Sequence, residues 1–203
     1  MIVTISMEYG TGATAIAAAA AAALGYEVID DQLPVVVAKR LQISERAVEA
    51  AEDSRRSIGE RMMTGLELAT PEVLSAPLPE NFDETMLRAV QTAVREYAAR
   101  GNIILLGRGA GVILGRRPDL VRVFLHAPRA WRIERIAAAI GDAKLATVEV
   151  DRIDAARRAY IKDWYGERWG DVERYDVLVD VSSFGLDGAA GLIVASVRAR
   201  RDA

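Results

Sequence analysis

Short apolar runs alternate along this chain with longer segments of helical periodicity, and the alternation predicts the order of its elements. Five runs rich in β-branched and other apolar residues predict strands at residues 2–6, 26–29, 103–106, 121–125 and 175–181. Helical patterns predict helices at residues 13–24, 32–69, 84–100 (capped by Asp83), 131–140, 148–165 and 186–200. Because largely apolar strands alternate with helices, we expect an α/β fold with a parallel sheet covered on both faces.

Three prolines between residues 70 and 79 interrupt this alternation and predict a loop. The chain has 203 residues, a length that fits one domain. Hydrophobic residues make up 51% of it and charged residues 27%, a composition that is typical of globular proteins and excludes disorder. We therefore expect a single domain over residues 1–203.

Scarce residue types exclude several kinds of site. There is no cysteine, so disulfides, thiolate metal sites and cysteine nucleophiles are excluded. His126 is the only histidine, which excludes a metal site built from several histidines and favours a hydrogen-bonded place in the core. The formal net charge of −3 argues against general nucleic-acid binding, because such binding depends on surplus Lys and Arg.

An uncharged stretch, residues 9–26, contains an alanine run and has to be distinguished from a targeting or membrane segment. A secretory signal begins with basic residues, whereas here Glu8 precedes the stretch and Lys39 is the first basic residue. Alanine is also too weakly apolar to hold a helix of this length in lipid. We expect a buried helix in a soluble, cytoplasmic protein that binds neither membrane nor nucleic acid.

Ligands of such a sheet bind outside the carboxyl ends of its strands. Five segments are expected to meet there: residues 7–14, 30–31, 107–111, 126–135 and 182–183. The first is a strand, a glycine turn and a helix N-terminus, an arrangement that presents backbone N–H groups to phosphate.

This first segment matches the P-loop pattern G-x-x-x-x-G-K-[ST] in part. Gly12 and Thr14 match the second glycine and the hydroxyl that binds Mg²⁺. Met7 and Ala13 stand where the pattern has its first glycine and its lysine. The segment is therefore predicted to bind phosphate without a cation of its own, and the alternative is an ordinary tight turn.

Arginines elsewhere in the chain could contribute the missing positive charge. Seven arginines but only two carboxylates lie between residues 108 and 135. Arg157, Arg158 and Lys162 lie about one turn apart on a predicted helix and share a face. Such clusters are usually solvated, but Arg108 stands between two glycines directly after a core strand, where a ligand would bind. We interpret Arg108 as functional.

Six motifs follow one another along the chain: I-S-x-E-Y-G-T-G, V-I-D-D, L-L-G-R-G-A, V-F-L-H-A-P-x-x-W-R-I-E-R-I, R-R-A-Y-I-K-D-W-Y-G-x-x-W-G-D and Y-D-V-L-V-D-V-S-S. The series resembles the cytidylate kinase-like family, a branch of the P-loop nucleoside monophosphate kinases, over nearly the whole chain. The resemblance implies a three-layer P-loop kinase fold with a five-stranded parallel sheet. It also implies a helical acceptor-binding region at residues 32–82 and a helical lid at residues 129–170.

The resemblance assigns roles to particular residues. It implies that the donor phosphates lie against Gly10, Thr11, Gly12, Ala13 and Thr14, with Thr14 at Mg²⁺. Asp30 and Arg108 match residues at the acceptor, although Gly109 replaces the aspartate of the family's Gly-Arg-Asp motif. Arginines of the lid match Arg132, Arg135, Arg157 and Arg158. Relatives carry arginine where this chain has Met7 and Thr14.

Two hypotheses about function follow. In the first, the protein is a kinase that transfers the γ-phosphoryl group of Mg²⁺-bound ATP to a small acceptor such as CMP or dCMP. In the second, the missing loop cation marks a catalytically impaired relative that binds a nucleotide or phosphorylated ligand as a regulatory module. A purely structural domain would leave the glycine and arginine segments unexplained. Met- and Leu-bearing helices before residue 70 are compatible with a homodimer.

Overall fold

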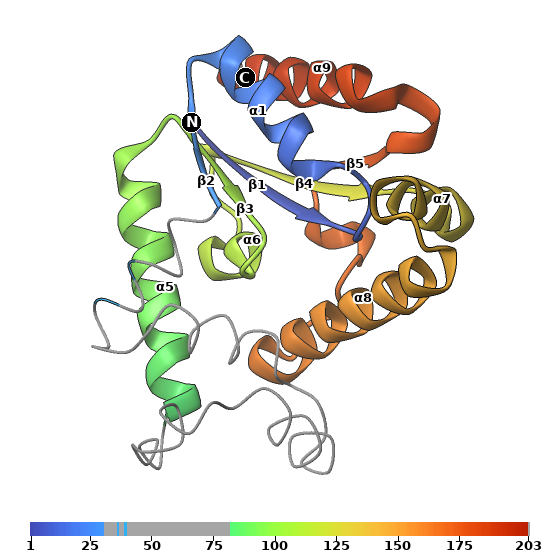
Figure 1. Cartoon of the computed structure of the whole chain (residues 1–203). Helices are drawn as coiled ribbons and strands as arrows, with labels where there is room; N and C mark the ends of the chain where they lie inside the picture. Colours follow the sequence, from blue (N-terminus) through green and yellow to red (C-terminus); the bar gives the residue numbers. More distant parts are fainter. Residues whose placement is uncertain (31–35, 37–38, 40–81, 203) are drawn as a thin grey trace.

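The computed structural model describes residues 1–30, 36, 39 and 82–202 of the chain (Figure 1). The helix predicted at residues 32–69, the loop predicted at residues 70–79 and nearly all of the expected acceptor-binding region lie outside the described residues.

Five parallel strands form the sheet, in the spatial order β2-β3-β1-β4-β5. Their bounds are Ile2–Met7 (β1), Glu27–Ile29 (β2), Ile103–Leu106 (β3), Leu120–His126 (β4) and Val177–Asp180 (β5). The central strand β1 pairs with β3 on one side and β4 on the other, with Ile5 opposite Leu106 and Met7 opposite Leu125. All five predicted strands are confirmed, and the strand order reverses beside β1, where sheets of this kind bind ligands.

Helices cover both faces of the sheet (Figure 1). On one face α1 (Ala13–Leu24) and α9 (Val181–Arg201) pack against Val3, Ile5 and Ile104. On the other, α5 (Phe82–Arg100) and the short α6 (Ala110–Leu114) pack against Ile2, Ile103 and Leu105. The side chains of successive strand residues thus point to opposite faces of the sheet, and both faces are buried. The expected α/β fold is confirmed.

The alanine run forms α1, as predicted. Ala17, Ala20 and Ala21 are buried on the side of α1 that packs against the sheet and α9. Alanine has the highest helix propensity, and its small side chain lets the helix lie close to the sheet. Among the described residues, no helix has the length and apolar character needed to cross a membrane.

Two further helices lie at the carboxyl edge of the sheet: α7 (Arg129–Ile140) and α8 (Ala143–Tyr165). The predicted start of α8 at residue 148 is wrong by five residues. Asp142 caps the helix, because its carboxylate accepts hydrogen bonds from the N–H groups of Lys144 (2.8 Å) and Leu145 (3.0 Å).

Other boundaries also differ from the prediction. The expected cap Asp83 lies inside α5, which begins at Phe82. No helix was predicted at the glycine-rich segment 107–111, but the one-turn helix α6 begins within it, at Ala110. The helix expected from residue 186 begins at Val181, and Gly185 (φ 68°, ψ 179°) interrupts its regular geometry.

A partly buried ion pair joins β4 to the start of β5, and we expect it to make stability depend on acid. The Arg122 guanidinium donates to both carboxylate oxygens of Asp176, at 2.9 and 3.2 Å. Burial, the largest single effect, would raise the pKa of Asp176, but the hydrogen bonds and charge of Arg122 and the charge of Arg200 together outweigh burial and hold that pKa below its usual 3.8. The stabilisation is therefore present above pH 3.8 and is lost as the pH falls through the lowered native pKa.

Asp176→Asn tests this ion pair. We expect the variant to lose about 2 kcal/mol of unfolding free energy at neutral pH, because charge-assisted hydrogen bonds are lost. It should also lose the part of the difference in stability between neutral and acidic pH that Asp176 contributes. Urea denaturation at several pH values measures both effects, and an unchanged pH dependence would contradict the assignment to Asp176.

Candidate functional site

The segment between β1 and α1, residues 8–12, is a tight loop that we call the glycine loop. Gly10 (φ 89°) and Gly12 (φ 79°) adopt left-handed conformations that favour glycine. A Cβ atom at Gly10 would lie 3.1 Å from the Cβ and the carbonyl oxygen of Arg132, so the loop packs closely against α7. Gly12 is the N-cap of α1, and no side chain caps that end. The positive end of the α1 dipole is therefore directed toward the loop.

A cavity of about 770 Å³ lies against the glycine loop, and we call it the loop cavity. The glycine loop and the first turn of α1, including the exposed Thr14, form one side. Asp30, Leu106 and parts of α7 and α8 complete it. The cavity thus joins a helix N-terminus, a hydroxyl and cationic side chains, which is the chemistry that binds phosphate.

Arg135 of α7 places a positive charge at the N-terminus of α1. A Cβ atom at Gly12 would lie 3.0 Å from Nη2 of Arg135, and the guanidinium lies over the ring of Trp131, 5.7 Å from its centroid. Arg135 lines the loop cavity. The charge that the loop sequence lacks at Ala13 is therefore present beside the loop.

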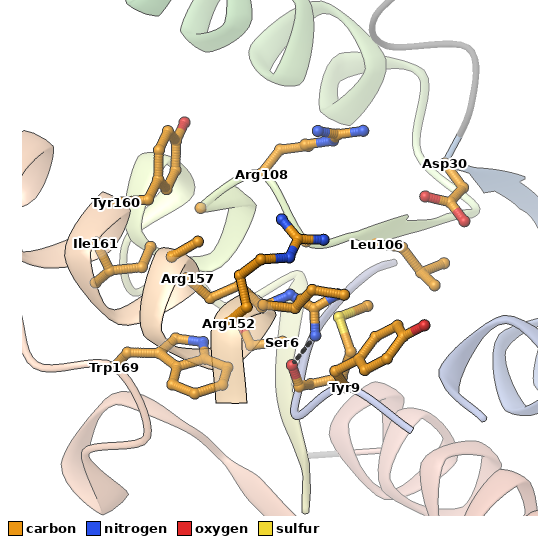
Figure 2. A pocket seen from close by; sticks show the side chains of 15 residues that line it. Ser6, Tyr9, Asp30, Leu106, Arg108, Arg152, Arg157, Tyr160, Ile161 and Trp169 are labelled. Atoms are coloured by element: carbon orange, nitrogen blue, oxygen red, sulfur yellow. Dashed lines mark hydrogen bonds between the residues drawn. The ribbon is translucent and has the colours of Figure 1, made fainter. Parts of the chain in front are cut away.

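A second cavity, of about 330 Å³, lies next to the first, and we call it the arginine cavity. Figure 2 shows the side chains of Arg108, Arg152 and Arg157 directed into this region, with Asp30 on one side and Trp169 on the other. Asp30 and Arg157 line both cavities. The arrangement gathers three arginines and the carboxylate of Asp30 around a cavity that adjoins the loop cavity, and Arg152 is paired with Glu149 of the same helix at 3.2 Å.

Arg157 of α8 lies where the two cavities meet. Its Nη1 donates a hydrogen bond of 2.8 Å to the carbonyl oxygen of Met7, the last residue of β1 (dashed in Figure 2). Burial lowers the pKa of Arg157 and Asp154 opposes that effect, while the charge of Arg108 lowers it further. Arginine remains protonated at neutral pH. One permanent cation therefore faces both cavities.

Arg108 is held in an uncommon conformation at the end of β3. Its φ is 55°, and its two neighbours, Gly107 (64°) and Gly109 (68°), are also left-handed. The N–H of Ala110 closes this turn on the carbonyl of Gly107 at 3.0 Å. Such a conformation costs a non-glycine residue about 1–2 kcal/mol. The cost is local, and the conformation directs Arg108 into the arginine cavity.

Gly109 stands where the family's motif has an aspartate, and it lies close to the side chain of Tyr165. A Cβ atom there would lie 3.0–3.3 Å from the ring and hydroxyl of Tyr165, at the end of α8. The Tyr165 hydroxyl lies 3.4 Å from that of Tyr160, which lines the arginine cavity. An aspartate at position 109 would displace Tyr165.

Arg132 and Arg158, which the resemblance places among the lid arginines, are not among the described residues that line either cavity. Arg132 is buried because its guanidinium is bound inside the protein, at 2.6 Å to Asp154 and 2.9 Å to the carbonyl of Tyr9. Arg158 lies over the ring of Trp169, 5.8 Å from its centroid. Residues 182–183 bind Asp180 instead, through both serine hydroxyls.

Sequence reasoning missed several residues of the site. Arg152 and Tyr160 line the arginine cavity together with Arg157. Arg152 and Tyr160 are eight residues apart, a spacing that brings two side chains to the same side of a helix, so helical periodicity could have predicted that they lie together. Trp169 packs edge-on against Phe124 at 5.4 Å and also lines the arginine cavity. No cluster of three or more His, Cys, Asp or Glu suited to a metal occurs in the described parts of the chain.

Comparison with known proteins gives concordant results. The model of the cytidylate kinase-like family matches residues 2–183. A cytidylate kinase of Methanocaldococcus jannaschii is 28% identical over 106 residues, which cover 50% of this chain and 59% of that enzyme. The matched part of the chain thus spans less than two thirds of that relative.

Solved structures agree on the fold. An uncharacterized protein of Eubacterium ventriosum superposes with a TM-score of 0.69 at 19% identity, over 98% of both chains. A shikimate kinase of Bacteroides thetaiotaomicron gives 0.52 at 13% identity, also over 98% of both chains. The fold is that of P-loop kinases.

Gly109→Ala tests the contact between Gly109 and Tyr165. Gly141→Ala is the matched control, because Gly141 has a similar φ of 77° and nothing within 4 Å of an added Cβ atom. The control should lose about 1 kcal/mol of unfolding free energy from backbone strain alone. Gly109→Ala should lose a further 1–3 kcal/mol, roughly, because Tyr165 must move. Equal losses in urea denaturation would refute the close contact.

Proposed function

Because the chain belongs to the cytidylate kinase-like family, we propose that it transfers the γ-phosphoryl group of ATP to a small phosphate-bearing acceptor, for which CMP and dCMP are the first candidates. The observation that carries the proposal is the position of Arg135 and Arg157. These two cations flank a glycine loop that has none of its own. Phosphoryl transfer depends mainly on positioning and on neutralising charge, so such cations are what the reaction requires.

The loop cavity fits the triphosphate donor. Backbone N–H groups at the uncapped N-terminus of α1 would bind phosphate oxygens, and Arg135 would neutralise their charge. The exposed hydroxyl of Thr14 would hold Mg²⁺, which offsets negative charge on the phosphates when it is bound. The N–H groups and Thr14 belong to the first turn of α1 and Arg135 to α7, and all of them line one cavity.

The arginine cavity fits an acceptor that carries its own phosphate. Arg108 and Arg152 would bind that phosphate, and Asp30 would accept a hydrogen bond from the acceptor. Arg157 faces both cavities and would contact the phosphoryl group as it passes from donor to acceptor. Tyr160 and Trp169 give the far wall an aromatic surface against which a base could pack.

The alternative function is nucleotide binding without transfer. It is favoured by Ala13, because the lysine of the P-loop pattern contacts the phosphate that is transferred. The two functions differ in whether Arg135 and Arg157 replace that lysine in catalysis or only in binding.

Arg135→Gln tests the role of Arg135 in transfer. We expect kcat/KM for ATP to fall on the order of a hundredfold, because one electrostatic contact with the developing charge is removed. The matched control is Arg129→Gln on the same helix, whose guanidinium binds Asp151 on the surface. A coupled phosphotransfer assay with CMP as acceptor measures both variants. Equal activities would argue against the role of Arg135.

Ala13→Lys separates the two functions. In the wild-type background the new cation meets Arg135 beside Gly12, so we expect no gain in turnover, or a loss. Combined with Arg135→Gln, the same substitution should restore a large part of the lost activity. If Ala13→Lys only tightens ATP binding, and every variant including the wild type lacks turnover, the binding module is the correct function.

A further inference from the structure

We propose that Asp154 is a positioning residue: together with Arg132 it holds the backbone of the glycine loop in its phosphate-binding conformation. The proposal rests on the proposed function, since it concerns the loop that would bind the donor. In this proposal α7 and α8 hold the backbone of the glycine loop in place and also carry cations that line the cavities.

Both backbone polar groups of Tyr9 are bound by this pair of side chains. One carboxylate oxygen of Asp154 accepts a hydrogen bond from the N–H of Tyr9 at 2.9 Å, and the other accepts one from Nη1 of Arg132 at 2.6 Å. The same Nη1 donates to the carbonyl oxygen of Tyr9 at 2.9 Å. The peptide groups on either side of Tyr9 therefore have defined orientations.

Neighbouring residues are held in the same way. The Glu8 carboxylate lies 3.3 Å from Nε of Arg132 and accepts the N–H of Ala127 at 3.1 Å. Arg157 binds the carbonyl of Met7. Three successive residues that lead into the glycines thus depend on side chains of α7 and α8, or on the segment just before α7.

Burial makes the pair persistent. The side chains of Arg132 and Asp154 are 6% and 4% exposed. Water does not replace a partner at such depth, and separating the pair would leave two unpaired buried charges. Because Gly10 also lies directly against the backbone of Arg132, we infer that α7, α8 and the loop move as one unit.

This arrangement couples the conformation of the glycine loop to the position of the cation Arg135 beside it. Arg135 follows Arg132 by three residues on α7, so one helix turn separates the side chain that holds the loop from the side chain that faces its cavity. A shift of α7 would misdirect the N–H groups and withdraw the cation together. Loss of the Asp154 charge should therefore weaken donor binding although Asp154 does not line the loop cavity.

Asp154→Asn tests the proposal, with Asp151→Asn as its matched control. The variant keeps the size of the side chain and an oxygen for the Tyr9 N–H, but its charge is lost and an NH₂ group can face Arg132. Asp151 lies on the same helix and also binds an arginine of α7, Arg129, but that pair is 53% and 55% exposed. Two quantities are measured at a temperature where circular dichroism shows each protein folded: the Kd of Mg²⁺-bound ATP and hydrogen exchange of the amides at residues 9–15.

We expect Asp154→Asn to raise the Kd about tenfold or more and to accelerate exchange in the loop, since a charge-assisted contact to the backbone is lost. Asp151→Asn should change neither quantity. A folded Asp154→Asn protein with wild-type Kd and wild-type exchange would overturn the proposal, because a merely structural carboxylate lowers the unfolding temperature alone. If Asp154→Asn does not fold, Glu8→Gln, which loosens Arg132 from the edge of the pair, must show the same two changes to a smaller degree.

The exchange measurement separates this proposal from the proposed function. If the wild-type protein binds no ATP, the kinase function fails, and faster loop exchange in Asp154→Asn than in Asp151→Asn still supports positioning by Asp154. Equal exchange in the two variants would overturn positioning, whether or not ATP binds.

Discussion

The ion pair between Arg132 and Asp154 is the interaction on which the rest of the site depends. Two charges removed from water must satisfy one another and find further partners, and here those partners are the backbone of the glycine loop. The pair joins α7 to α8 and joins both helices to the carboxyl edge of the sheet. Arg135 and Arg157, which line the cavities, lie on these two attached helices.

From this attachment follows an unusual distribution of charge around the loop. A P-loop carries its lysine within its own sequence, whereas here Arg135 and Arg157 reach the loop from α7 and α8. Because these cations lie in partly enclosed cavities, they act on a bound anion more strongly than exposed charges would. The absence of the lysine at Ala13 therefore does not leave the loop without positive charge.

Much of the fold could be predicted from the sequence, because its signals are local. Apolar runs predicted the five strands, and the alanine run predicted α1. Gly10 and Gly12 were recognised as loop glycines, and Arg108 as a residue at the carboxyl end of a core strand, from their immediate neighbours. Local signals could not predict contacts with distant elements. An example is Gly109, which lies in space against Tyr165, at the far end of α8.

The arginines of α7 illustrate the same limit. Arg132 and Arg135 are one turn apart, and the family motif treats them alike. Partners outside α7, including Asp154 on the next helix and the carbonyl of Tyr9, bind Arg132 internally, while Arg135 faces the loop cavity. Such a choice depends on packing between helices, which no pattern within α7 contains.

We propose that α7 and α8 complete a nucleotide site on a loop that has no lysine. Calorimetric titration of the wild-type protein with ATP and with CMP, each with and without Mg²⁺, is the decisive test. We expect saturable ATP binding that Mg²⁺ strengthens, and CMP binding that persists when the loop cavity is already filled by ATP. A folded protein that binds neither nucleotide would refute this role of α7 and α8.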